Sequence, residues 1–248
     1  MRRIAPIVVL LLALAGCGGD DSGGNAASSQ SIVVSAAASL TDALTSCSKQ
    51  FEGANVRLSF AGSDELAAQI RQGVKPDVYA AANTKLPDQL ATEGLLDTPV
   101  TFATNELVIA VPKDSGISSI NDLAKPGTKL VIGSETVPVG SYTREVLGRL
   151  PSGEEQKIMA NVRSNEPDVK GVVGKLTMGA ADAGFVYRTD LTGDLKAITL
   201  PKDLQPVVEY GAGVVKGAKN PDMAKQYLDG LTNGACADAL RSAGFGSP

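Results

Sequence analysis

The chain has 248 residues, of which 43% are hydrophobic and 20% are charged, and its formal net charge is −4. This length and composition suffice for one large domain or two lobes with real cores, and they exclude a wholly disordered chain. The sequence has no His, the commonest general base and transition-metal ligand. Net acidity argues against a nucleic-acid partner, and three Cys cannot form a four-thiolate zinc site. The composition favours a binding protein over an enzyme.

The first seventeen residues have the pattern of an export signal. Arg2 and Arg3 precede an apolar run, residues 4–15, which is too short to span a bilayer comfortably. The following Leu14-Ala15-Gly16-Cys17 resembles the bacterial lipoprotein box, in which the Cys is diacylated and becomes the new N-terminus. Two acyl chains are enough for stable membrane anchoring. The alternative is an ordinary signal peptide with an incidental Cys.

Processing before this cysteine would divide the N-terminal region in two. Residues 1–16 would be the signal peptide, and residues 17–30, rich in Gly, Ser, Asn and Asp, would form a flexible tether. The folded body would then begin near Ser31. Loss of the two signal arginines lowers the net charge from −4 to −6. We therefore expect an exported protein that is lipid-anchored to the outer face of the cytoplasmic membrane.

Short apolar strands alternate with helices along the body of the chain, which is typical of mainly parallel α/β sheets. The expected strands are residues 31–37, 55–60, 77–81, 107–111, 129–133, 183–187, 198–200 and 207–215. A first helix is expected to open at Ser39 as its N-cap. The other expected helices are residues 64–72, 84–93, 120–124, 140–150, 169–178, 222–231 and 235–243.

Two further cysteines bear on the domain organisation. Cys47 lies on the apolar stripe of the first helix, and Cys236 lies on the last helix. Outside the cytoplasm they can form a disulfide, although two separate buried thiols are the alternative. With that bridge, lobe one would comprise residues 31–108 and 212–248, and lobe two residues 109–211. The two connecting strands would then form a hinge beside a cleft.

Four turns place small polar residues between a strand and a helix start. They are Ala38–Leu40, Gly62–Asp64, Pro138–Ser141 and Pro167–Lys170. Helix N-termini offer free N–H groups and a partial positive charge, which together suit an anion without a cationic side chain. In parallel α/β sheets, ligands bind beyond the carboxyl ends of the strands, where these turns lie. A single Ser before a helix is usually only a cap, but two such turns in each lobe favour an anion site.

Several motifs resemble, in order and spacing, those of the molybdate-binding proteins of ABC importers. They are Ala36–Ala43, Phe60–Ser63 with Leu66–Ile70, Pro76–Ala82, Val137–Tyr142, Asp168–Gly171 and Gly184–Tyr187. The resemblance covers the chain from Ser31 to its end. It implies a periplasmic-binding-protein-like fold of type II, in which two α/β lobes close on a tetrahedral oxyanion. Each lobe would be a mainly parallel sheet flanked by helices.

The resemblance also implies five ligand residues. Ser39 and Ser63 resemble the two lobe-one serines that bind the anion through hydroxyl and backbone N–H groups. Val139 and Val169 resemble lobe-two positions that donate backbone N–H groups, and Tyr187 resembles a phenol that donates a further hydrogen bond. The metal would be bound only as the molybdate oxyanion through these residues, and no cofactor is expected.

Two positions depart from the family's pattern. Asp64 stands where these proteins usually carry a small or neutral polar residue. At a helix start an Asp can satisfy the dipole while pointing to solvent, whereas inside the cleft it would repel a dianion or accept a proton. Val139 replaces a common Ala and adds bulk beside the cavity.

The resemblance implies capture of molybdate, and also of tungstate, for delivery to the membrane permease of an ABC importer. We expect a monomer with no enzymatic activity and no nucleic-acid partner. Sulfate or another tetrahedral oxyanion is the alternative ligand, and its rejection must rest on oxyanion size.

Two other classes of protein are weaker alternatives. An exported serine hydrolase would use Ser39 or Ser63 as its nucleophile, but the sequence offers neither a His nor a G-x-S-x-G elbow. A surface adhesin would need an exposed aromatic or apolar patch, and aromatic residues make up only 4% of the chain.

Overall fold

A computed structural model describes residues 30–248. The expected signal peptide, the lipidation site Cys17 and all but the last residue of the expected tether lie outside the described residues. That last residue, Gln30, already begins the first strand. Among the described residues, no helix combines the length and the apolar character needed to cross a membrane.

The first sheet forms the core of lobe one and has the strand order β2-β1-β3-β10-β4. Its strands are β1 (Gln30–Ala37), β2 (Ala54–Ala61), β3 (Val78–Ala81), β4 (Val100–Asn105) and β10 (Val208–Val214). Its helices are η1 (Ala38–Leu40), α1 (Thr41–Ser48), α2 (Ser63–Arg71), α3 (Lys85–Thr92), α7 (Pro221–Thr232) and α8 (Ala235–Ser242). Strand β1 pairs in parallel with β2 and β3, whereas β10 runs antiparallel to β3 and β4.

The second sheet forms the core of lobe two and has the order β7-β6-β8-β5-β9. Its strands are β5 (Leu107–Pro112), β6 (Leu130–Gly133), β7 (Val162–Glu166), β8 (Ala183–Tyr187) and β9 (Leu195–Thr199). Its helices are η2 (Ile120–Ala124), α4 (Pro138–Gly148), α5 (Glu154–Ala160), α6 (Val169–Thr177) and η3 (Arg188–Asp190). Strand β6 pairs in parallel with β7 and β8, whereas β5 runs antiparallel to β8 and β9.

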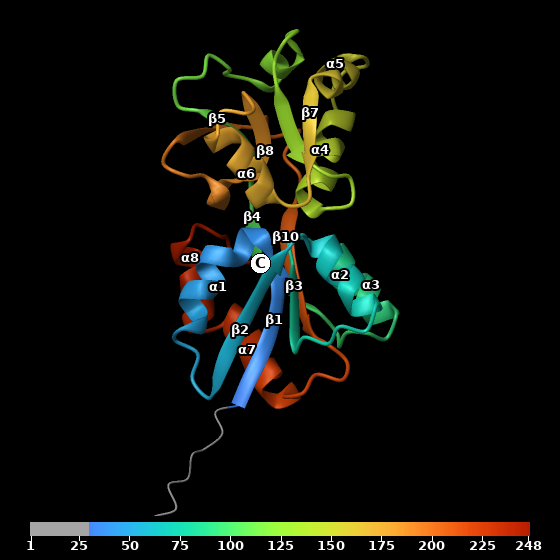
Figure 1. The fold of residues 1–248 in the computed structure, drawn as a ribbon, viewed down its shortest axis with the longest axis vertical. Coiled ribbons are helices and arrows are strands. Elements are labelled where there is room, and N and C mark those ends of the chain that lie inside the picture. Colours follow the sequence, from blue (N-terminus) through green and yellow to red (C-terminus); the bar gives the residue numbers. More distant parts are fainter. Residues whose placement is uncertain (1–29) are drawn as a thin grey trace, which may run out of the picture.

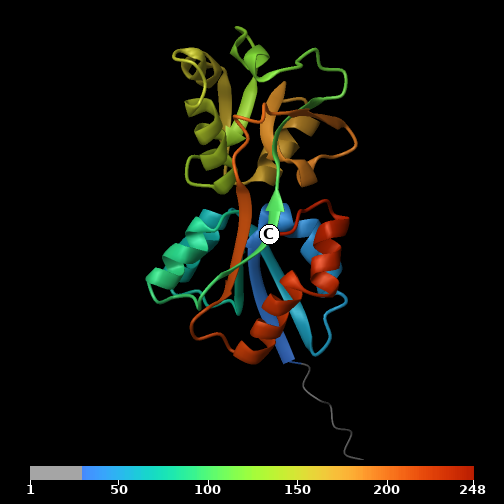
Figure 2. The same ribbon diagram turned by 180° about the vertical axis from the view of Figure 1, so that it is seen from behind.

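In each sheet, the antiparallel strand is the one that arrives from the other lobe. The chain leaves lobe one through β4 and enters lobe two as β5, then leaves through β9 and returns as β10. The parallel strands end at the cleft, whereas a strand that arrives from the other lobe begins there, so it must be antiparallel to them. Figures 1 and 2 show the two lobes one above the other with these connections between them. The carboxyl ends of the parallel strands therefore face each other across the cleft, and the two-lobed α/β architecture is confirmed.

The crossings between lobes fall slightly earlier than the expected domain boundaries. The boundaries after residues 108 and 211 would cut through β5 and β10, each of which pairs along its length within one sheet. The chain instead changes lobes at Glu106 and again before Val208. Because a strand is a single hydrogen-bonded unit, the hinge lies between strands and not inside them.

Four elements have no counterpart among those expected, namely β4, β7, α5 and η3. Strand β7 has the polar sequence Val-Arg-Ser-Asn-Glu and is at most half-buried at the edge of its sheet, so it lacks an apolar run. Helix α5 buries only Ile158.

Ser39 is not an N-cap as expected: it lies inside η1, and α1 begins two residues later at Thr41. The 3₁₀ turn moves the Ser39 side chain away from a capping role.

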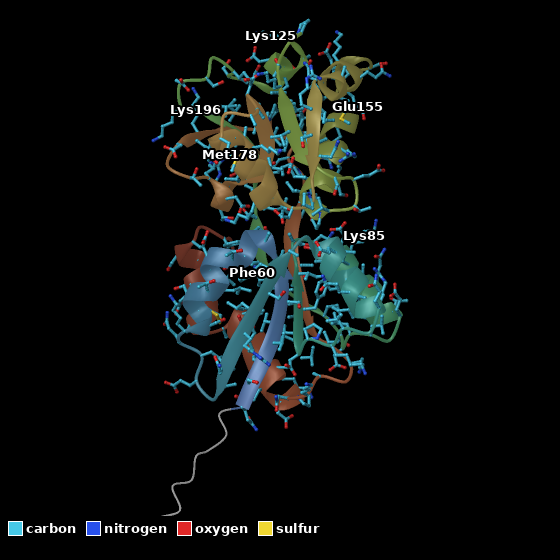
Figure 3. The ribbon with its side chains drawn as sticks, viewed as in Figure 1. Phe60, Lys85, Lys125, Glu155, Met178 and Lys196 are labelled. Carbon is cyan, nitrogen blue, oxygen red and sulfur yellow. A yellow bond between two sulfur atoms is a disulfide. The ribbon has the colours of Figure 1, made fainter. Side chains whose placement is uncertain are left out.

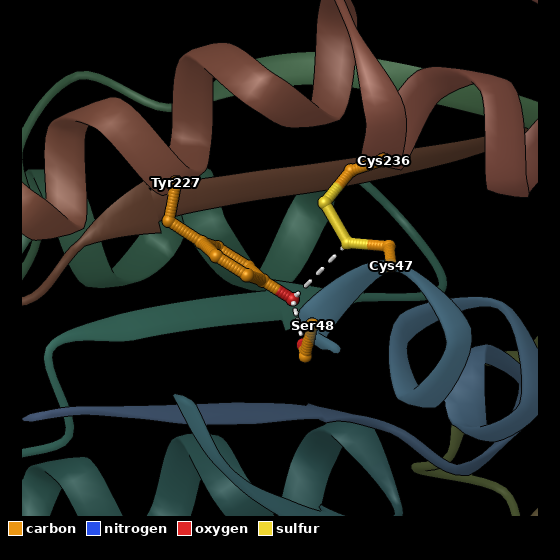
Figure 4. Close-up of a disulfide and its surroundings, with 4 residues drawn as sticks. All are labelled: Cys47, Ser48, Tyr227 and Cys236. Atoms are coloured by element: carbon orange, nitrogen blue, oxygen red, sulfur yellow. Dashed lines mark hydrogen bonds between the residues drawn. A yellow bond between two sulfur atoms is a disulfide. The ribbon is translucent and has the colours of Figure 1, made fainter. Parts of the chain in front are cut away.

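Apolar side chains fill the space between each sheet and its helices (Figure 3). In lobe one, a disulfide joins Cys47 on α1 to Cys236 on α8, with their Cα atoms 4.7 Å apart (Figure 4). Beside it, the hydroxyl of the buried Tyr227 lies 3.0 Å from Ser48 Oγ. The bridge ties the last helix to the first, so the end of the chain belongs to lobe one.

Candidate ligand-binding site

A cavity lies between the lobes where the carboxyl ends of both sheets meet. It measures about 10 Å³, which is about the space that one water-sized sphere needs. Its lining residues are Ala37, Ala38, Ser39, Ala61, Gly62, Ser63, Ala82, Val137, Pro138, Val139, Asp168, Val169 and Tyr187. The structure thus brings together all five residues that the sequence singles out for the ligand. A cavity of this size suits a small, compact ligand.

Ser39 reaches the cavity from the 3₁₀ turn η1 at the end of β1. Its Oγ accepts a hydrogen bond from the hydroxyl of Tyr210 at 3.0 Å. A hydroxyl has one proton and two lone pairs, so an accepted bond leaves the Ser39 proton available to another acceptor. The side chain is therefore arranged as a donor toward the cavity.

Ser63 is the first residue of α2 and is arranged in the same way. Its Oγ accepts a hydrogen bond from the backbone N–H of Ala82 at 3.1 Å. Its carbonyl oxygen accepts one from the hydroxyl of Tyr79 at 2.7 Å. These contacts fix the residue from behind and leave its hydroxyl proton, together with the N–H groups of the first α2 turn, to serve a ligand.

Lobe two contributes two helix N-termini. Helix α4 begins at Pro138, which has no N–H, so Val139 supplies the first N–H of that helix. Gly140 allows α4 to approach β6 closely, because a Cβ there would overlap the carbonyl oxygen of Ser134. Helix α6 begins at Val169, and its N-cap Asp168 accepts a hydrogen bond from Gly171 N–H at 2.9 Å. Both helices direct first-turn N–H groups and the positive end of their dipoles toward the cavity.

Tyr187 ends β8 and lies against the cavity with 1% of its surface exposed. Within residues 30–248 its hydroxyl has no hydrogen-bond partner. Burial raises the pKa of Tyr187 well above its ordinary value, so the phenol stays protonated at neutral pH. A buried hydroxyl without a partner costs about 1–3 kcal/mol. Tyr187 is therefore a donor whose acceptor would have to occupy the cavity.

Polar contacts also join the lobes outside the cavity. Thr136 of lobe two donates a hydrogen bond to the Asp64 carboxylate of lobe one, so the Asp64 side chain, whose direction the sequence left open, lies at the contact between the lobes. Lys170 Nζ of lobe two lies 3.3 Å from Asp42 Oδ2 of lobe one and 3.1 Å from the buried Asp190 Oδ1. Burial lowers the pKa of Lys170, but the two carboxylates raise it above its ordinary value. These contacts hold the lobes together.

Tyr210, Asn105 and Ala82 support the site, but sequence reasoning missed them. Tyr210 lies 171 positions from Ser39, and nothing in its local pattern shows that the two hydroxyls meet. Ala82 acts through its backbone N–H, which carries no signal in the side chain. The one indication of its role is that Tyr210 lies on β10, the strand on which the chain returns to lobe one.

Neutral donors converge on the site from both lobes. Hydroxyl protons of Ser39 and Ser63, helix N–H groups and the Tyr187 phenol surround one small space. In the part of the chain that the structure describes, no group of three or more His, Cys, Asp or Glu side chains is placed to hold a metal ion. Donors of this kind stabilise an anion, so fold and site define a two-lobed binding protein for a small anion.

Comparison with known proteins agrees with this class. Residues 32–246 match the family of bacterial extracellular solute-binding proteins, and the chain belongs to that family. It is 37% identical over 221 residues to the molybdate-binding protein ModA of Mycobacterium tuberculosis, covering 85% of this chain and 82% of that protein.

Two solved structures share the fold at low sequence identity. The periplasmic molybdate-binding protein of Azotobacter vinelandii has a TM-score of 0.76 at 22% identity, with 88% of this chain and 99% of that one covered. The sulfate-binding protein SubI of Mycobacterium tuberculosis has a TM-score of 0.74 at 16% identity, with 87% and 86% covered. The fold is therefore common to proteins that are named for different oxyanions.

Proposed function

We propose that this protein captures molybdate outside the cytoplasm and delivers it to the membrane permease of an ABC importer. The observation that carries the proposal is the convergence of neutral donors from both lobes on one small cavity, where the buried Tyr187 hydroxyl still needs an acceptor. The similarity to the molybdate-binding protein of Mycobacterium tuberculosis supports the choice of ion. Tungstate, with the same charge and shape, would bind at the same site.

The donor set explains which kind of anion would be accepted. A site made of donors stabilises a fully deprotonated tetrahedral dianion at every oxygen. Phosphate near neutral pH often carries a proton, and that proton would meet another donor instead of an acceptor. Asp168 also lines the cavity, and its Oδ1 accepts a hydrogen bond from Gly171 N–H. The chain's net charge of −4 gives no global attraction for anions, so affinity would come from this local geometry.

Sulfate satisfies the same charge and hydrogen-bonding rules, so molybdate would be distinguished from it by size alone. Calorimetric titration of the purified protein with molybdate, tungstate, sulfate and phosphate tests the proposal. We expect molybdate and tungstate to bind at least a hundredfold more tightly than sulfate, and phosphate to bind more weakly still. Equal affinities for sulfate and molybdate would contradict the named ligand while leaving an oxyanion-binding role in place.

The proposal includes binding without catalysis. In a serine hydrolase, the nucleophile donates its proton to a base. Here the Ser39 and Ser63 oxygens each accept a hydrogen bond from the protein, which leaves their protons directed to a ligand. Turnover of simple esters that disappears in Ser39→Ala would contradict this part of the proposal.

We further propose that the mature protein is anchored through a lipid on Cys17. The residues from Leu14 to Cys17 support this, since they match the lipoprotein box. Mass spectrometry of the protein from its native membrane should find an N-terminal Cys17 with two acyl chains. An unmodified cysteine, or cleavage at another position, would contradict the anchor but not the binding function.

A further inference from the structure

The Ser39 hydroxyl is supported from behind by two residues of the hinge. The Tyr210 hydroxyl donates to Ser39 Oγ at 3.0 Å, and Asn105 Nδ2 donates to the Tyr210 oxygen at 3.4 Å. Tyr210 lies on β10 and Asn105 is the last residue of β4, and these two strands connect the lobes. A row of three polar groups therefore runs from the hinge to the cavity.

The orientation of the Asn105 amide is fixed by its other contacts. Its Oδ1 accepts from the backbone N–H of Glu106 at 2.8 Å, and its Nδ2 donates to Thr189 Oγ1 at 2.9 Å. The nitrogen therefore faces Tyr210, and an amide nitrogen can only donate. The Tyr210 oxygen accepts this bond and sends its own proton to Ser39. Each group in the row donates in the direction of the cavity.

We propose that Tyr210 and Asn105 are positioning residues that hold the Ser39 hydroxyl as a donor to the bound oxyanion. This inference rests on the proposed function. Without a donor behind it, the Ser39 hydroxyl could turn its proton away from the ligand and present a lone pair, which repels an anion. Consecutive bonds that point the same way also polarise one another, which strengthens the last donor.

The burial of Tyr210 gives this arrangement its rigidity. The side chain is fully buried, and burial raises the pKa of Tyr210, so its hydroxyl keeps its proton. Its ring packs edge-on against Phe245, Tyr187 and Phe102, with centroids 5.3, 5.8 and 6.1 Å away. The contact with Tyr187 means that one aromatic ring supports both hydroxyl donors, Ser39 from lobe one and Tyr187 from lobe two.

Tyr210→Phe in the full chain removes the hydroxyl and keeps the ring. A lost hydrogen bond is worth about 1 kcal/mol, so we expect the Kd for molybdate to rise about five- to tenfold. The matched control is Tyr227→Phe, because Tyr227 is also a fully buried lobe-one tyrosine whose hydroxyl contacts a serine, Ser48. This control should lower the melting temperature but leave the Kd within twofold.

A double-mutant cycle separates positioning from general structural damage. If Tyr210 acts through Ser39, the change Tyr210→Phe should weaken binding by less than twofold in a Ser39→Ala background. Asn105→Asp replaces the donating nitrogen by an acceptor, so it should reverse the Tyr210 hydroxyl and weaken molybdate binding as Tyr210→Phe does.

Each outcome of the cycle decides the inference. Equal losses from Tyr210→Phe in both backgrounds, or no loss in the wild-type background, would overturn the role of Tyr210. Full affinity in Asn105→Asp would overturn the directed row of donors. If the wild-type chain does not bind molybdate, the proposed function fails. If the wild-type chain binds it but one of the results above is found, only the inference about Tyr210 and Asn105 fails.

Discussion

A Cβ atom added to Gly62 in lobe one would lie 2.5 Å from the carbonyl oxygen of Pro167 in lobe two. At Gly62 the two lobes therefore touch through their backbones, beside the cavity that both residues' segments border. The backbone of Gly62 has φ −58° and ψ 137°, a conformation that any residue adopts. Glycine is needed here for the approach of the lobes and not for the local chain path.

Gly62→Ala should therefore weaken ligand binding by obstructing closure. We expect the Kd for molybdate to rise at least tenfold, because the added methyl group would keep the two lobes apart at this contact. Gly174→Ala is the matched control, since Gly174 lies on α6 of the opposite lobe with open space around it. Calorimetric affinities of Gly62→Ala and Gly174→Ala that agree within twofold would show that closure does not depend on this contact.

Tyr187→Phe should change stability and affinity in opposite directions. Removing a buried hydroxyl that lacks a partner among residues 30–248 should raise the free energy of unfolding without ligand by about 1 kcal/mol. The same change removes a donor to the oxyanion, so the Kd for molybdate should rise about tenfold. Urea unfolding and calorimetry measure the two effects. If the variant is less stable than the wild type without ligand, the Tyr187 hydroxyl is not an unpartnered donor that waits for the oxyanion.

The stability of the protein should depend on pH through Asp190. Burial raises the pKa of Asp190 to about 6, although the Lys170 ammonium lowers it. An unfolded Asp has a pKa near 3.9, so the folded form binds the proton more tightly. The contribution of Asp190 to stability is therefore fully present below about pH 4 and is lost as the pH rises through about 6.

Asp190→Asn should remove this share of the pH dependence. The free energy of unfolding of the variant minus that of the wild type should become more positive by about 2–3 kcal/mol between pH 4 and pH 7. The variant also loses the ion pair with Lys170, which changes the difference in unfolding free energy at every pH. The test is therefore how that difference changes with pH, and not its value at one pH. Urea midpoints that stay parallel from pH 4 to pH 7 would rule out Asp190 as the titrating group.

The sequence predicts those strands whose burial requires a continuous run of apolar residues. Strands β5 and β8 are continuous apolar runs, Leu107–Val111 and Ala183–Tyr187, because both are buried inside their sheet. The edge strand β7 has polar residues and no such run, so only its neighbours reveal it. The antiparallel direction of β5 and β10 follows from the passage of the chain between lobes, which no local segment encodes.

The site was accessible in part for a related reason. Ser39, Ser63 and Tyr187 lie at the ends of predicted elements, and the family motifs indicate their roles. Tyr210 was missed because its contribution is a contact with Ser39 that only the assembled sheet creates. The position of Asp64 was also open, since a contact with Thr136 exists only when two lobes meet. Long-range contacts of this kind require the three-dimensional structure.

The most direct test of a closed oxyanion site is a crystal structure of the protein with molybdate bound. We expect a single ion in the cavity between the lobes, with its oxygens within about 3.2 Å of the Ser39, Ser63 and Tyr187 hydroxyls and the Val139 and Val169 nitrogens. An ion bound elsewhere, or one contacted from lobe one alone with Tyr187 turned away, would contradict this expectation.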